Sequence, residues 1–161
     1  MLIKYVYIVF VGILLAAFVG VGIAAFYKGP KAPEYPVELQ YAQVEKSGEP
    51  ANATAEAKRI ELQKQNDQAF KDFQKLDEVY NRNVSIVALL AAVLMLFVSL
   101  TLVKQILVIA DGLLLGGVLT LGYSVIRGFS SNDDMVRFLV VSASLAVALV
   151  LGYLKFVRTK A

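Results

Sequence analysis

The sequence predicts an all-α integral membrane protein, with four transmembrane helices and a long extramembrane helix that precedes the second span. Hydrophobic residues make up 58% of the 161 residues and charged residues 18%, and the mean hydropathy is +0.63. Soluble domains are only about 45–50% apolar. Four apolar stretches are also long enough to cross a bilayer, which needs about 20 residues, and a helix satisfies its own backbone hydrogen bonds there.

The first predicted span covers residues 1–26, and it has no charged residue between Tyr5 and Phe26. A secretory signal peptide is the alternative interpretation, because Lys4 precedes the run and the Gly-Ile-Ala stretch at 22–24 loosely resembles a cleavage site. The apolar run is longer than the ~7–15 residues of a signal-peptide core. We therefore favour a retained helix.

Residues 27–52 are predicted to form an extramembrane linker. Pro30, Pro33 and Pro36 recur at every third position, which is the repeat of a polyproline II helix. The pattern is typical of a stiff spacer leaving the membrane, and we favour this over a ligand for an aromatic groove.

Residues 53–83 are predicted to form an extramembrane amphipathic helix. The segment lacks Gly and Pro, and its acidic residues often precede basic ones at helical spacing, which adds about 0.2–0.5 kcal/mol per pair. No helix breaker separates it from the second span, so one long helix is an expectation. Its short apolar stripe cannot bury a core of its own. The stripe consists of Leu62, Ala69, Phe73, Leu76 and Tyr80.

This stripe predicts a contact, and two kinds of contact remain open. One is with a partner, either a sister copy or another membrane protein. The other is with the membrane surface or with the same chain.

The second and third spans, 84–103 and 104–127, are predicted to form a tight hairpin that turns near Lys104, because one straight helix would be about twice as long as the bilayer core is thick. A loop at 128–135 leads to the fourth span, 136–157, and to a basic tail, 158–161. Ser130 and Ser131 each stand three residues before an acid, which is a helix-capping signature. Gly128 suits the end of the preceding helix.

The distribution of basic residues predicts the orientation. Lys4, Lys104, Lys155 and the tail lie on one side without an acid, whereas bases and acids are mixed on the other side. Because bases near span ends mark the cytoplasmic side, we expect both termini in the cytoplasm and residues 27–83 outside, in a membrane such as the bacterial plasma membrane.

Small residues recur at every fourth position in three spans. Helix association in lipid depends on close backbone approach, which small residues permit. We favour packing within the bundle over binding of another subunit through the first helix. The predicted helix-packing residues are Gly12, Ala16, Gly20, Ala24, Gly112, Gly116, Thr120, Ser124, Ser144, Ala148 and Gly152.

Asp111 is the only acid within a predicted span, and an intramembrane charge is a functional candidate by default. It lies near the same side of the membrane as Lys155 and Arg158. We therefore expect an ion pair that joins the hairpin to the fourth helix, in preference to an ion or proton relay.

The chain contains no His and no Cys, which excludes thiol nucleophiles, Cys/His zinc sites and His-dependent triads. The sequence offers no catalytic, cofactor-binding or metal-binding residues and no concentrated basic surface for nucleic acid. We expect a non-enzymatic assembly, anchoring or accessory subunit. The alternative is a small oligomeric channel or transporter that uses Asp111.

Overall fold

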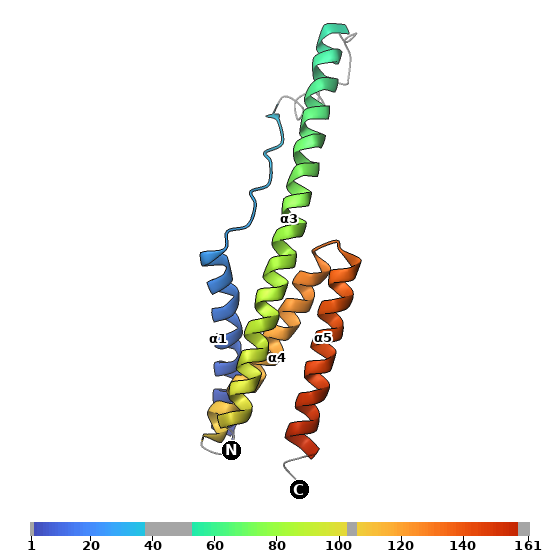
Figure 1. Cartoon of the computed structure of the whole chain (residues 1–161). Helices are drawn as coiled ribbons and strands as arrows, with labels where there is room; N and C mark the ends of the chain where they lie inside the picture. The colour runs from blue at the N-terminus through green and yellow to red at the C-terminus, as the bar shows by residue number, and fades with distance from the viewer. Residues whose placement is uncertain (1, 38–52, 103–105, 158–161) are drawn as a thin grey trace. The chain divides into compact units, whose positions relative to one another are not determined.

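The computed structural model describes residues 2–37, 53–102 and 106–157, with the backbone alone described at 53–55 and 156–157. Helix makes up 89% of the described residues, and no strand occurs among them. The all-helical prediction is therefore confirmed. The elements are α1 (Leu2–Phe26), α3 (Ala53–Leu102), α4 (Leu107–Phe129), α5 (Asp134–Gly152) and a π-helical turn, η1 (Tyr153–Val157) (Figure 1).

Four helices are long and apolar enough to cross a membrane, by length and composition: α1, the part of α3 from Glu56, α4, and α5 with the start of η1. The chain divides into two compact units. The four-helix unit consists of Met1–Gly29 and Glu78–Ala161, and the insert unit of Pro30–Asp77. The predicted turn at Lys104, the linker from 38 to 52 and the basic tail lie outside the described residues.

α3 is one helix of 50 residues, from Ala53 to Leu102. At 1.5 Å per residue it is about 75 Å long. It contains neither Gly nor Pro, so no residue type that breaks helices interrupts it. The extramembrane helix and the second span, predicted as 53–83 and 84–103, are thus one element.

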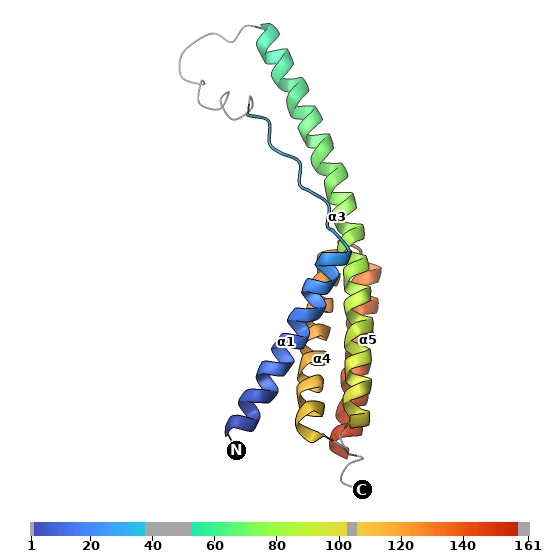
Figure 2. The ribbon, with the colours of Figure 1, turned by 90° about the vertical axis from the view of Figure 1, so that its left-hand side faces the viewer.

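α4 is the central helix of the four-helix unit, since it contacts α1, α5 and the part of α3 that belongs to this unit. A small apolar core lies where α3, α4 and α5 meet. It consists of Ala92, Leu96 and Leu121, with Leu89, Leu114, Val147 and Leu151 packed around it. The start of α1 and η1 lie at one end of this unit, and the loop between α4 and α5 lies at the other (Figures 1 and 2).

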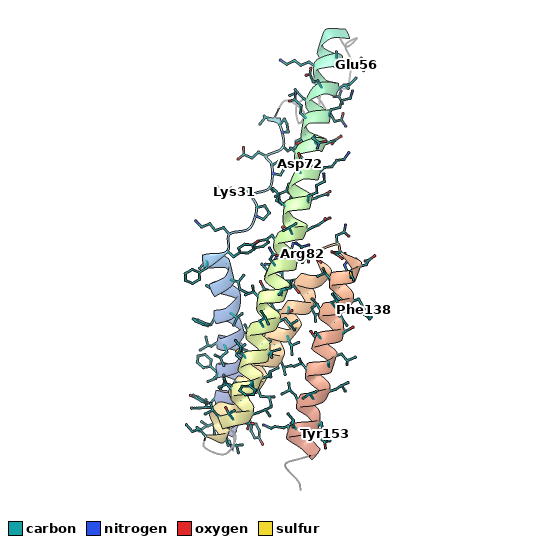
Figure 3. The ribbon with its side chains drawn as sticks, in the orientation of Figure 1. Lys31, Glu56, Asp72, Arg82, Phe138 and Tyr153 are labelled. Carbon is teal, nitrogen blue, oxygen red and sulfur yellow. The ribbon has the colours of Figure 1, made fainter. Side chains whose placement is uncertain are left out.

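The outer faces of α1 and α5 remain apolar and uncovered. In the most apolar 18-residue stretch of each helix, only 11% of the residues are buried in α1 and 6% in the stretch that includes α5. Figure 3 labels Phe138 of α5 and Tyr153 at the start of η1, and these side chains are 71% and 61% exposed.

The loop between α4 and α5 corrects the predicted caps. Asp133 caps α5, because its Oδ1 accepts hydrogen bonds from the backbone N–H groups of Met135 and Val136. Ser131 Oγ instead donates to the Gly128 carbonyl oxygen at 2.7 Å. Gly128 lies inside α4 and is buried. The Ser131 hydroxyl is thus bonded to the preceding helix, and the backbone N–H groups at the start of α5 are bonded to Asp133.

In the insert unit, Pro30, Pro33 and Pro36 are half-buried, whereas the residues between them are exposed. The segment therefore has one covered side, and the three prolines lie on it. Figure 2 shows that the segment diverges from α3 along its course. One side of α3 is also covered within the same unit.

Candidate functional site

α1 and α4 approach each other closely at three glycines. A Cβ atom at any of them would lie closer to the opposite helix than the ~3.5–4.0 Å of normal carbon contacts. The distances from such a Cβ atom are 2.8 Å from Gly12 to Leu115 Cγ, 2.9 Å from Gly112 to Val11 Cγ1, and 2.9 Å from Gly116 to Leu15 Cβ. These small residues permit the contact between the two helices.

Four of the remaining predicted packing positions on α1 and α5 lie in open surroundings. A Cβ atom at Gly20 or Gly152 would meet nothing within 4 Å, and Ala24 and Ala148 are exposed. Ala16 is half-buried. Ser144 is also half-buried, and its Oγ has no hydrogen-bond partner within the described ranges. Among the described residues, the pattern of every fourth residue therefore marks close contacts of α4, with α1 at Gly112 and Gly116 and with α3 at Ser124.

α3 and α4 are joined by buried hydroxyl groups. Ser85 Oγ donates to the Ser124 carbonyl oxygen at 2.7 Å, and Ser124 Oγ donates to the Ser85 carbonyl oxygen at 2.8 Å. Ser99 Oγ donates to the Ala110 carbonyl oxygen at 2.6 Å. The hydroxyl of Thr120, the other polar position of the α4 pattern, is bonded within α4, to the Gly116 carbonyl oxygen.

The packing face of α3 was missed by sequence reasoning. Val84 is buried, and from Ser85 on the buried positions follow helical spacings of three and four residues, and most of them are small. They are Ser85, Ala88, Ala92, Leu96 and Ser99. The search for small residues at every fourth position overlooked this mixed spacing. It also overlooked Gly117, where a Cβ atom would lie 2.5 Å from Leu96 Cδ2.

At the end of the unit near Leu2, Lys155 Nζ lies 2.6 Å from Asp111 Oδ1. The side chains are 23% and 29% exposed, respectively. The ion pair expected between Asp111 and the end of the fourth helix is present. Lys155 belongs to η1, a π-helical turn; such turns are rare and frequently occur at functional sites. The pair joins α4 to the end of α5.

At the opposite end, Arg127 is held by two aromatic rings and two hydrogen bonds. Its guanidinium carbon lies 5.9 Å from the ring centre of Tyr80 and 5.5 Å from that of Tyr123. Nη1 donates to Asn81 Oδ1 at 2.8 Å, and Nε donates to the Tyr123 hydroxyl at 3.1 Å. Tyr27 stacks on the Tyr80 ring with centres 5.1 Å apart. We call these five residues the Arg127 cluster.

The predicted contact stripe of the insert is divided between two sides of α3. Phe73 and Leu62 are half-buried, while Ala69 is exposed and Leu76 is 61% exposed. Tyr80 belongs to the Arg127 cluster. The covered side of the insert helix instead runs through Leu62, Asn66, Phe70 and Phe73. The prolines of the same unit are also half-buried.

Comparisons of the chain with protein-family models, with curated proteins and with solved structures find no match. No group of three or more side chains of the types His, Cys, Asp and Glu is placed to hold a metal ion among the described residues. What the chain does is therefore inferred from its own geometry.

Proposed function

We propose that this chain is a four-span integral membrane protein that acts as a non-catalytic assembly, anchoring or accessory subunit. The observation that carries the membrane placement is the uncovered apolar surface of the helices. Phe18, Phe97 and Phe138 are 75%, 67% and 71% exposed. In water, such a continuous apolar surface promotes association or aggregation, whereas lipid solvates it and the helical backbone needs no water.

The proposed orientation follows from the basic residues. Lys4 and Lys155 flank the ends of α1 and α5, and the tail at 158–161 adds further bases. Bases near span ends favour the cytoplasmic side. We therefore place both termini in the cytoplasm and the insert on the outer side of a plasma membrane.

The proposed contact role rests on the exposed apolar side chains of α3 outside the apolar stretch. Ala69, Leu76 and Val79 are exposed at spacings of seven and three residues, with Leu76 61% and Val79 45% exposed. We call these three residues the contact face. Residues at such spacings share one side of a helix. The occupant we propose is a second copy of the chain or another membrane protein.

Photocrosslinking from Leu76 tests this role. With p-benzoylphenylalanine at Leu76, we expect an adduct of higher mass in native membranes, because this side chain faces outward. The matched control is the same probe at Phe73, three residues earlier on the covered side, where we expect no intermolecular adduct. Mass spectrometry of the adduct distinguishes a second copy from a different protein. If neither Leu76 nor Val79 yields an adduct, the contact role is wrong.

A further inference from the structure

The Arg127 cluster holds a cation that is not paired with any acid of the four-helix unit, within the residues that the structure describes. The four-helix unit contains four acids, and each has another interaction. Asp111 pairs with Lys155, Asp134 pairs with Arg137, Asp133 caps α5, and Glu78 accepts a hydrogen bond from Asn132. Within the described ranges, no carboxylate oxygen of this unit pairs with Arg127.

The guanidinium group of Arg127 is held in place by its neighbours, but some of its N–H donors have no hydrogen-bond acceptor within the described residues. Arginine carries five N–H donors, and two of them are used, by Asn81 and by Tyr123. The remaining donors include both hydrogens of Nη2, and the side chain is only half-buried. A planar guanidinium group with free donors matches the oxygen atoms of a phosphate group, which it binds through two parallel hydrogen bonds.

The position of the cluster indicates where the phosphate comes from. Arg127 follows the apolar run of α4 and lies two residues before its end at Phe129. In the membrane placement proposed above, on which this inference rests, that level is the bilayer surface. Tyrosine rings favour the same level, where the ring is apolar and the hydroxyl is solvated. Lipid phosphates are the abundant anions there.

We infer that Arg127 binds the phosphate group of an anionic lipid headgroup. The Tyr80 and Tyr123 rings and the Asn81 side chain position the guanidinium group, and its free donors bind the phosphate oxygens. An anionic lipid is preferred over a zwitterionic one because its headgroup has no cation that competes for the phosphate.

Native mass spectrometry of the full chain with added phosphatidylglycerol tests the inference. We expect Arg127→Gln to retain about tenfold less lipid than the wild type, as loss of a charge-assisted hydrogen-bond pair implies. The matched control is Arg137→Gln, which removes an equal charge at the same end of the unit. Arg137 already pairs with Asp134 at 3.0 Å, so we expect wild-type retention. Equal loss in both variants would show general charge attraction and would overturn the inference.

A second arm identifies the source of the phosphate. Excess inorganic phosphate is added to the protein that carries phosphatidylglycerol. We expect the lipid to stay bound, because its acyl chains are held by the surrounding apolar surface. Displacement by inorganic phosphate would assign the site to a soluble phosphate compound and would overturn the lipid inference.

A third arm uses the unaltered protein, in case Arg127→Gln does not fold. The chain is reconstituted with phosphatidylglycerol that carries a photoreactive group at the headgroup, or one in the acyl chain. We expect the headgroup probe to label the Arg127 cluster. Labelling confined to other residues would contradict headgroup binding. The acyl-chain probe should label the outer faces of α1 and α5, and it tests the membrane placement separately.

Discussion

Replacing Gly116 with Leu is expected to force α1 away from α4 and to lower the apparent melting temperature in detergent by about 2–12 °C. A Cβ atom at this position would lie 2.9 Å from Leu15 Cβ and 3.2 Å from the Gly12 carbonyl oxygen. Neither atom lies at the end of a flexible side chain, so the backbones must separate. Overpacking costs about 1–3 kcal/mol and occasionally more, and each kcal/mol shifts the melting temperature of a chain of this size by about 2–4 °C.

Gly122→Leu is the matched control for this variant. Gly122 lies on the same helix and is exposed, and a Cβ atom there would meet nothing within 4 Å. Leucine is a better helix former than glycine by nearly 1 kcal/mol, so we expect an unchanged or slightly higher melting temperature. Thermal unfolding followed by circular dichroism measures both variants. Similar destabilisation by both would show that the close contact between α1 and α4 does not stabilise the fold.

Breaking the Asp111–Lys155 pair is expected to give the second large effect. Lys155→Met removes the cation that pairs with the carboxylate of Asp111, and the Asp111 side chain is only 29% exposed. We expect a loss of about 1.5–3 kcal/mol, the usual contribution of a hydrogen bond to a charged group. Asp111→Asn should cost less because the amide oxygen still accepts a hydrogen bond from Lys155. The double variant should recover part of the loss, because coupled pairs show interaction energies of about 0.5–3 kcal/mol.

Asp134→Asn provides the comparison, since the Asp134–Arg137 pair is more exposed and should contribute less than ~1 kcal/mol. Strictly additive stability losses for the Asp111 and Lys155 variants would contradict a structural pair.

The Asp111→Asn variant also tests the alternative function in liposomes. A cation flux carried by the wild type and abolished in this variant would make Asp111 a transport residue, and the chain a channel or transporter.

Much of this architecture could be predicted from residue types alone. Long uncharged runs predict helices without knowledge of their neighbours, which is why the end of α1 at Phe26 was anticipated. The ion pair was anticipated because Asp111 and Lys155 lie near the same end of successive spans. The absence of Gly and Pro around Asn83 likewise favoured the single helix α3.

Other features depend on tertiary contacts that the sequence pattern does not encode. The predicted stripe assigned Leu76 and Phe73 to one side of a helix, but their exposure depends on which side the rest of the insert unit covers. The serine caps were wrong because α5 begins at Asp134, directly after Asp133, whose carboxylate accepts the first backbone N–H groups, while Ser131 bonds to the preceding helix. The π-helical turn that contains Lys155 has no signature in this sequence.

The membrane boundary within α3 is the central claim, and cysteine accessibility tests it most directly. The natural chain has no cysteine, so Leu76→Cys and Leu90→Cys each give a single thiol. The two leucines are 61% and 60% exposed on the same helix, so the protein itself shields them equally. In native membranes we predict that a membrane-impermeant maleimide labels position 76 and not position 90, and that both are labelled in denaturing detergent. Equal labelling of both positions in native membranes would contradict the claim that α3 enters the bilayer.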